Sequence, residues 1–236
     1  MTKDVALIVG VGPGLGAALA RRFAQGGLAV AVAARRVDAL SELAREIGGR
    51  AYACDATEED SVSQLFAAVE RDLGRPAVVV YNAGAFSPGS VLEIDAAEFE
   101  RCWRALCLGG FLVGQCAARG MVEAGRGTIL LTGATASLRG AANFGAFAGA
   151  KAALRALAQS LARELGPRGI HVAHVVVDGA IDTAFIRENF PERYALKEQE
   201  GILNPDHIAD SYWMLHSQPR DAWTHELDLR PWMEKF

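Results

Sequence analysis

The stretch Gly10-Val11-Gly12-Pro13-Gly14-Leu15-Gly16 closes the apolar run Val5–Gly10 and leads directly into a helical pattern at residues 14–26. Glycines allow a tight turn, and they let backbone N–H groups approach a pyrophosphate at the positive end of a helix. Glycine-rich turns also occur for packing reasons alone, but a strand before and a helix after favour nucleotide binding. We therefore predict that Gly10, Gly14, Leu15 and Gly16 hold the phosphates of a dinucleotide.

Short apolar runs alternate with longer amphipathic ones along the rest of the chain, which is typical of a parallel sheet covered by helices on both faces. The predicted strands are Val5–Gly10, Leu28–Ala34, Ala51–Cys54, Ala77–Tyr81, Thr128–Thr132 and His171–Val177, with His225–Leu229 as a candidate seventh. The predicted helices cover residues 14–26, 38–47, 58–73, 96–124, 144–165 and 205–217. We expect an α/β fold, a doubly wound parallel sheet of the Rossmann type in three αβα layers, as a single domain over residues 1–236.

The composition excludes several classes of protein. Of the 236 residues, 51% are hydrophobic and 22% charged, and the net charge is −4, which is ordinary for a globular enzyme and unlike a nucleic-acid or anionic-membrane binder. Four cysteines form no C-x-x-C pair and accompany no histidine cluster, so we expect free thiols and no metal site. With no signal peptide pattern and no apolar run of spanning length, we expect a cytoplasmic protein without a membrane or nucleic-acid partner.

The end of the second predicted strand bears on the choice of dinucleotide. It reads Ala33-Ala34-Arg35-Arg36, with no acidic residue before Asp38. An acidic side chain there would bind the ribose 2′-hydroxyl of NAD, whereas arginine suits the 2′-phosphate of NADP. We predict that Arg35 and Arg36 favour NADP(H). NAD(H) remains an alternative, because both arginines could simply lie in solvent.

Together these motifs resemble the short-chain dehydrogenase/reductase family along nearly the whole chain. The spacing Gly10-x-x-x-Gly14-x-Gly16 matches the cofactor turn of that family. The resemblance implies that Asp55 contacts the adenine ring and that Asn82, Ala83 and Gly84 shape the adenine–ribose side of the cleft. The segment Asp178–Thr183 resembles the family's Pro-Gly segment, which assigns Thr183 to the nicotinamide carboxamide and leaves Asp178 where proline is usual.

The resemblance also implies hydride transfer between the nicotinamide and a carbonyl or alcohol carbon, with a tyrosine, a serine, an asparagine and a lysine at the site. Lys151 matches the lysine that binds the nicotinamide ribose. Phe147 stands where the tyrosine is expected, Ala134 where the serine is expected, and Cys107 at the asparagine position. We therefore predict that the usual proton donor is replaced, and the catalytic residues stay unknown. Nearby hydroxyls that could partly replace the serine belong to Thr132, Thr135 and Ser137.

Three functions remain open. The chain could be an NADP(H)-dependent oxidoreductase of unusual mechanism, in which another group or the substrate supplies the proton; candidates in the variable segment are Tyr194, His207, Tyr212 and His216. It could be a non-catalytic NADP(H)-binding protein, such as a sensor or the silent partner of an active relative. It could serve mainly as a structural subunit. The family resemblance implies a homodimer or homotetramer, and the sequence does not identify the small-molecule substrate. Trp213, Trp223 and Trp232 fit either a subunit interface or the subunit interior.

Overall fold

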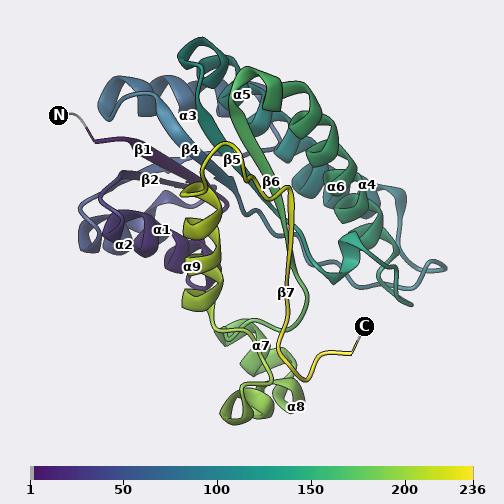
Figure 1. Ribbon diagram of the computed structural model, residues 1–236. Coiled ribbons are helices and arrows are strands. Elements are labelled where there is room, and N and C mark those ends of the chain that lie inside the picture. Colours follow the sequence, from purple (N-terminus) through teal and green to yellow (C-terminus); the bar gives the residue numbers. More distant parts are fainter. Residues whose placement is uncertain (1–2, 236) are drawn as a thin grey trace.

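The computed structural model describes residues 3–235, and its centre is a sheet of seven parallel strands (Figure 1). Their order across the sheet is β3-β2-β1-β4-β5-β6-β7. The strands are β1 (Val5–Val9), β2 (Ala29–Ala34), β3 (Arg50–Ala53), β4 (Pro76–Tyr81), β5 (Gly127–Thr132), β6 (Ile170–Val177) and β7 (Glu226–Leu229). The order reverses between β1 and β4, so the predicted doubly wound sheet is confirmed, including its seventh strand.

Helices cover both faces of the sheet. On one face lie α1 (Leu15–Gln25), α2 (Ser41–Glu46) and α9 (Pro205–His216), and on the other lie α3 (Glu59–Asp72), α5 (Gly109–Ala124) and α6 (Gly145–Leu165). Helix α4 (Ala96–Trp103) packs against α6. A 3-10 turn, η1 (Val37–Leu40), precedes α2. The three predicted layers are therefore present.

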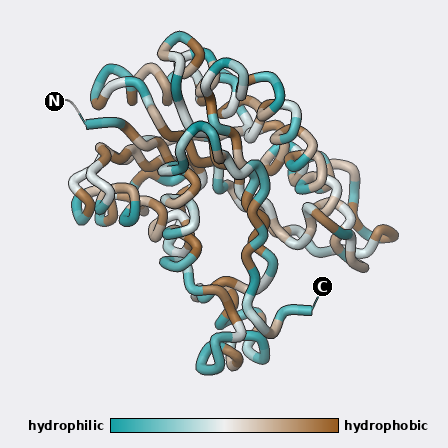
Figure 2. Tube along the Cα trace, in the orientation of Figure 1, coloured by the Kyte–Doolittle hydropathy of each residue, from teal (hydrophilic) through white to brown (hydrophobic). Residues whose placement is uncertain are grey.

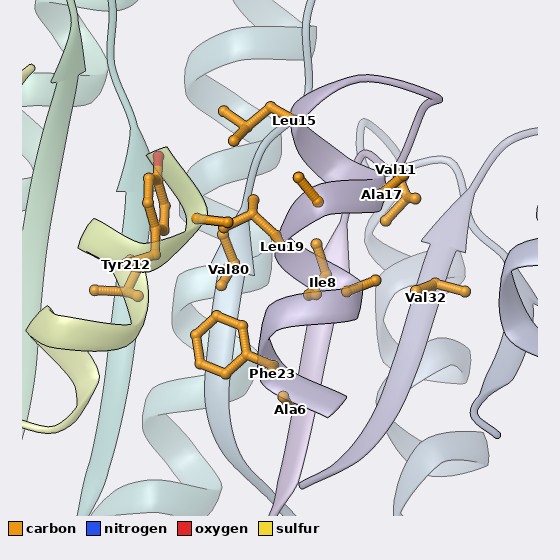
Figure 3. Close-up of a cluster of buried hydrophobic side chains, with 14 of the residues drawn as sticks. Ala6, Ile8, Val11, Leu15, Ala17, Leu19, Phe23, Val32, Val80 and Tyr212 are labelled. Carbon is orange, nitrogen blue, oxygen red and sulfur yellow. The ribbon is translucent and has the colours of Figure 1, made fainter. Parts of the chain in front are cut away.

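The core has two halves, one on each side of the sheet. In β1 every side chain is buried, with Ala6 and Ile8 facing α1 while Leu7 faces the opposite layer. Figure 3 shows the first half, where Phe23 of α1 lies beside Ala6, Ile8 and Leu19. Burial on both faces explains why the strands are continuously apolar instead of alternating. Hydrophobic residues accordingly run along the central strands in Figure 2.

The predicted helix over residues 96–124 is interrupted. A π-helical turn, η2 (Arg104–Leu108), joins α4 to α5, and the hydroxyl of Tyr81 donates to the carbonyl of Ala105 within it at 2.5 Å. By length and composition alone, the segment Ala96–Ala124 is apolar enough to cross a membrane. Half of its most apolar part is buried within the fold, as in the core helix of a folded domain.

The variable segment after β6 forms short helices that the sequence did not predict. They are α7 (Ala184–Asn189), α8 (Pro191–Tyr194) and the 3-10 turn η5 (Ala195–Gln199). The three C-terminal tryptophans differ in their surroundings. The ring of Trp213 lies 5.7 Å from that of Phe23, and Trp223 stacks on His171 at 5.0 Å, so both pack within the subunit. Trp232 is 75% exposed.

Candidate cofactor and reaction site

The glycine turn between β1 and α1 leaves no room for larger side chains at three of its positions. Gly10 has a φ of +87°, and a Cβ there would collide with the backbone of Ala83. A Cβ on Gly16 would lie 2.8 Å from the Cα of Val11, and one on Gly14 would lie 2.6 Å from the side chain of Thr183. The glycines therefore permit close packing at the point where α1 begins and its N–H groups point outward.

Beside this turn lies a cavity of about 830 Å³ at the carboxyl ends of β1, β2, β3 and β4. Its size falls within the range of small-molecule and cofactor sites. The cavity brings together six of the predicted binding residues, which are Gly10, Arg35, Arg36, Asp55, Ala83 and Gly84. The others, Gly14, Leu15, Gly16, Asn82, Lys151 and Thr183, do not form its wall. A crevice where the strand order reverses is the usual ligand site of open α/β sheets.

Charged side chains line the cavity on two sides. Arg35 and Arg36 are exposed at the end of β2. Asp55 lies on the wall after β3, and its Oδ1 accepts hydrogen bonds from the N–H of Thr57 at 3.0 Å and from its hydroxyl at 2.8 Å. Burial acts to raise the pKa of Asp55, but these bonds and the coulombic effect of Arg35 outweigh it and lower the pKa. Asp55 thus stays an anionic hydrogen-bond acceptor opposite a cationic strand end.

Asn82 holds the glycine turn against the end of β4. Its Nδ2 donates to the carbonyl of Gly10 at 3.2 Å, and its backbone N–H donates to the carbonyl of Val9 at 2.8 Å. The sequence predicted Asn82 as a wall residue of the cleft. In the structure its side-chain amide fixes the turn that would hold the phosphates, and Ala83 and Gly84 form the wall.

Lys151 is buried within α6 and does not reach the cavity. Its Nζ donates to the carbonyl of Thr132 at 2.6 Å and lies 6.0 Å from the centre of the Phe147 ring. Burial lowers the pKa of Lys151 to about 8. Phe147 and Lys151 therefore share one face of α6, as their spacing predicts.

The loop after β5 arranges the hydroxyl groups near Ala134. The N–H of Ala134 donates to Ser137 Oγ at 3.1 Å, and Thr132 Oγ1 lies 2.8 Å from the hydroxyl of Tyr212. Thr135 Oγ1 donates to Asp178 at 2.5 Å. Each of these hydroxyls thus already has a partner inside the protein.

Cys107 lies in the π-helical turn and is 8% exposed. Burial raises the pKa of its thiol, so the thiol favours its neutral form. The other cysteines are also free thiols, as predicted, with Cys54 and Cys102 buried and Cys116 partly exposed.

The other candidate proton donors are dispersed. Tyr212 is fully buried and bonded to Thr132, and His216 Nδ1 lies 3.1 Å from Thr128 Oγ1 near the amino end of β5. His207 is exposed on α9, and Tyr194 lies beside Lys197. The geometry therefore does not gather these four side chains into one catalytic group.

Two features near the site could not be predicted from local patterns. Phe86, which follows the cavity wall residue Ala85, contacts the rings of four other phenylalanines at 5.6–6.1 Å; they are Phe144, Phe147, Phe185 and Phe190. The five rings, that of Phe86 included, come from three separate segments of the chain. Thr183 caps α7 by accepting a hydrogen bond from the N–H of Ile186 at 3.3 Å, so α7 begins against the glycine turn.

The fold and the glycine turn agree with the comparison to known proteins. Residues 4–193 match the family described as short chain dehydrogenase. The chain belongs to the short-chain dehydrogenase family. The matched part of this chain includes β1 to β6 and ends before α9 and β7.

Among its relatives in the short-chain dehydrogenase family is the cyclic-di-GMP-binding biofilm dispersal mediator protein of Escherichia coli K12. It is 37% identical over 213 residues, covering 88% of this chain and 87% of that protein. A short-chain dehydrogenase from Rhodopseudomonas palustris has a similar structure, with a TM-score of 0.82, 37% identity, and coverage of 97% of this chain and 99% of that one. A metagenomic short-chain oxidoreductase in complex with NADP aligns with a TM-score of 0.83 and 28% identity over 99% of both chains.

Proposed function

We propose that this chain is an NADP(H)-binding member of the short-chain dehydrogenase family and an oxidoreductase of unusual mechanism. The observation that carries the proposal is the cavity itself, in which the glycine turn, Asp55 and the arginine pair Arg35 and Arg36 meet. The turn at Gly10 has no room for a side chain, so backbone and ligand can approach closely. These residues fit a dinucleotide.

Within this proposal, Arg35 and Arg36 bind the 2′-phosphate, because a guanidinium group pairs with phosphate through a planar fork of donors. Asp55 accepts hydrogen bonds from the adenine side, and the N–H groups at the start of α1 bind the pyrophosphate. When bound, the nicotinamide supplies a hydride donor or acceptor. Lys151 stays buried against the carbonyl of Thr132 and does not line the cavity.

The reaction end of the site differs from what the family resemblance implies. The phenyl ring of Phe147 has no exchangeable proton, and Ala134 offers only its backbone. Loss of a positioned general acid typically costs ~10² to 10⁴ in rate, and loss of an oxyanion donor costs ~10² to 10³. We therefore propose that ordinary carbonyl reduction by this chain is slow.

A second candidate is a non-catalytic protein that binds NADP(H) or a related nucleotide. Two observations favour it. Phe147 packs among aromatic rings where a proton donor is expected, and the Escherichia coli relative is named for binding cyclic di-GMP. The four arginines on the cavity wall, Arg21, Arg35, Arg36 and Arg101, suit an anionic nucleotide in either case.

One experiment separates the two candidates. Wild type and the double variant Phe147→Tyr, Ala134→Ser are assayed with NADPH on a panel of ketones and aldehydes. The oxidoreductase proposal predicts slow but measurable wild-type turnover that the double variant increases. Turnover in the double variant alone would support the binding-only candidate. Robust wild-type turnover would contradict the proposed replacement of the proton donor.

We also propose a homodimer or homotetramer. Three large apolar side chains, Phe99, Trp103 and Phe111, are 39–48% exposed along α4 and α5. Exposed apolar clusters of this kind commonly mark interfaces. Light scattering coupled to size exclusion tests this, and a monomeric mass would contradict it.

A further inference from the structure

Arg101 of α4 is a charged side chain on the cavity wall, and the proposed function gives it no particular group of the dinucleotide. Ala105, about one turn later, also lines the cavity, as do Gly84 and Ala85 from the chain that leaves β4. Residues four apart lie on one face of a helix. This face closes the cavity from the side of the sheet that carries α6, opposite to α1.

The same stretch of α4 contacts the reaction end of the site. Cys102, the next residue, packs with Ala85 of the cavity wall in an apolar cluster that Phe147 of α6 also contacts. Burial raises the pKa of the Cys102 thiol, and the positive charges of Arg101 and Lys151 both act to lower it. Arg101 therefore lies on the cavity wall beside the part of α6 that carries Phe147 and Lys151.

Glu98 fixes the guanidinium group of Arg101. Its carboxylate accepts hydrogen bonds from Nε and Nη2, each at 2.6 Å, and a further one from the hydroxyl of Ser87. The bonds from Arg101 and Ser87 lower the pKa of Glu98 to about 2, so this carboxylate stays charged. Within residues 3–235 the guanidinium makes only the two bonds to Glu98, which leaves both N–H groups of Nη1 available. The Arg101 side chain is 54% exposed.

Arg75 shows, in the same chain, how a guanidinium group in this state binds a second carboxylate. Its Nε and Nη2 donate to Glu70 at 3.2 and 3.1 Å, and its Nη1 donates to Glu123 at 2.9 Å. Arg101 binds Glu98 through the same two nitrogens, so its Nη1 corresponds to the nitrogen that holds Glu123. A carboxylate in the cavity can occupy that place, because guanidinium and carboxylate groups form strong charge-assisted hydrogen bonds.

We propose that Nη1 of Arg101 binds a carboxylate of the substrate, so that the site selects an oxo acid or hydroxy acid over a neutral ketone or alcohol. The inference rests on the proposed function, because it places the substrate beside a bound dinucleotide. The phosphates of that dinucleotide have other partners, Arg35, Arg36 and the start of α1, which leaves Arg101 for the second molecule. We expect a carboxylate to bind about fivefold more tightly than the corresponding amide, the order that a partly exposed ion pair contributes.

The test compares 4-oxopentanoate with 4-oxopentanamide on the protein saturated with NADP⁺. The two probes have the same shape and differ in charge, and their flexible chain lets the ketone and the end group settle independently. Dissociation constants come from saturation-transfer NMR. We expect wild type to bind the carboxylate about fivefold more tightly, and this ratio should fall as salt is raised, because the ion pair is partly exposed.

Two arginine variants show whether the preference belongs to Arg101. Arg101→Gln should bring the two dissociation constants within about twofold of each other and leave that of NADP⁺ within about twofold of wild type. Arg104→Gln is the matched control, because it removes the same charge three residues later. Arg104 binds Glu58 and the carbonyl of Thr57 and does not line the cavity, so this variant should keep the wild-type ratio.

Several results would overturn the inference. They are equal or tighter binding of the amide by wild type, a wild-type ratio in Arg101→Gln, and binding of neither probe. Weaker NADP⁺ binding by Arg101→Gln with an unchanged probe ratio would assign the arginine to the cofactor and also contradict it. The NADP⁺ titration that precedes the test reports separately on the proposed function. Saturable NADP⁺ binding without a carboxylate preference would contradict this inference alone, whereas absence of NADP⁺ binding would contradict the proposed function.

Discussion

Replacing His174 by asparagine should reduce the dependence of stability on pH. His174 lies in β6, fully buried, with Nδ1 3.0 Å from Glu226, which also accepts two hydrogen bonds from Arg155 at 2.6 Å. Burial lowers the pKa of His174 more than the hydrogen bond and negative charge of Glu226 raise it, so the pKa falls from 6.5 to about 4. Below pH 6.5 the unfolded chain binds a proton that the folded protein takes up only near pH 4. The free energy of unfolding therefore falls as the pH falls through this window.

The size of the effect follows from the two pKa values. Between pH 7 and pH 5, protonation of this one residue in the unfolded chain lowers the free energy of unfolding by roughly 2 kcal/mol. Asparagine cannot be protonated, and its amide can still donate to Glu226. His171 and His216, whose pKa values burial also lowers, remain in the variant. The difference between wild type and variant therefore isolates His174.

The assay is urea unfolding followed by tryptophan fluorescence at pH 7 and pH 5. Between pH 7 and pH 5, we expect the free energy of unfolding to fall by roughly 2 kcal/mol more in wild type than in His174→Asn. His207→Asn is the control, because this exposed ring stays in water when the chain folds, and it should behave as wild type. If His174→Asn loses as much stability as wild type, His174 does not titrate as described.

Three further changes test the packing and the cofactor turn. Tyr212→Phe leaves the buried Thr132 hydroxyl without its 2.8 Å partner and should lower the free energy of unfolding by ~1–2 kcal/mol in urea; an unchanged midpoint would refute this. Gly10→Ala puts a Cβ against Ala83 at a φ of +87° and should lower the Tm by several degrees and weaken NADPH binding, whereas wild-type values in both would contradict the tight turn. In fluorescence titrations, Arg35→Ser should weaken the binding of NADPH about tenfold and leave the binding of NADH unchanged. An equal loss of affinity for both nucleotides would argue against a contact between Arg35 and the 2′-phosphate.

Most of the fold was predictable from the sequence because its patterns are local. The apolar runs at Val5–Gly10 and His171–Val177 are strands because they are buried on both faces, and the glycine turn falls between β1 and α1 as predicted. Of the six predicted residues on the cavity wall, Gly10, Arg35 and Arg36 were singled out by the glycine turn and by the end of the second strand, and the other three only by the family resemblance. Burial of Cys54 and Cys102 also agrees with the prediction of free thiols.

The remaining features depend on contacts between distant segments. The sequence singled out Asp178 as a departure from proline, but its partners Arg139 and Arg230 lie 39 residues before it and 52 after it. The π-helical turn arises where Tyr81 reaches the carbonyl of Ala105, which an uninterrupted apolar helical pattern does not reveal. The aromatic cluster around Phe86 likewise has no local periodicity. Such tertiary contacts determine the reaction end of the site, and they are where the sequence is least informative.

Titration of the wild-type protein with NADPH and with NADH, followed by nicotinamide fluorescence, tests the central claim most directly. With Arg35 and Arg36 on the cavity wall, we predict saturable binding of NADPH at least about tenfold tighter than that of NADH. The preference should shrink as salt is raised, because the exposed guanidinium groups are screened. NADH binding as tight as or tighter than NADPH, or no saturable binding of either, would contradict the account.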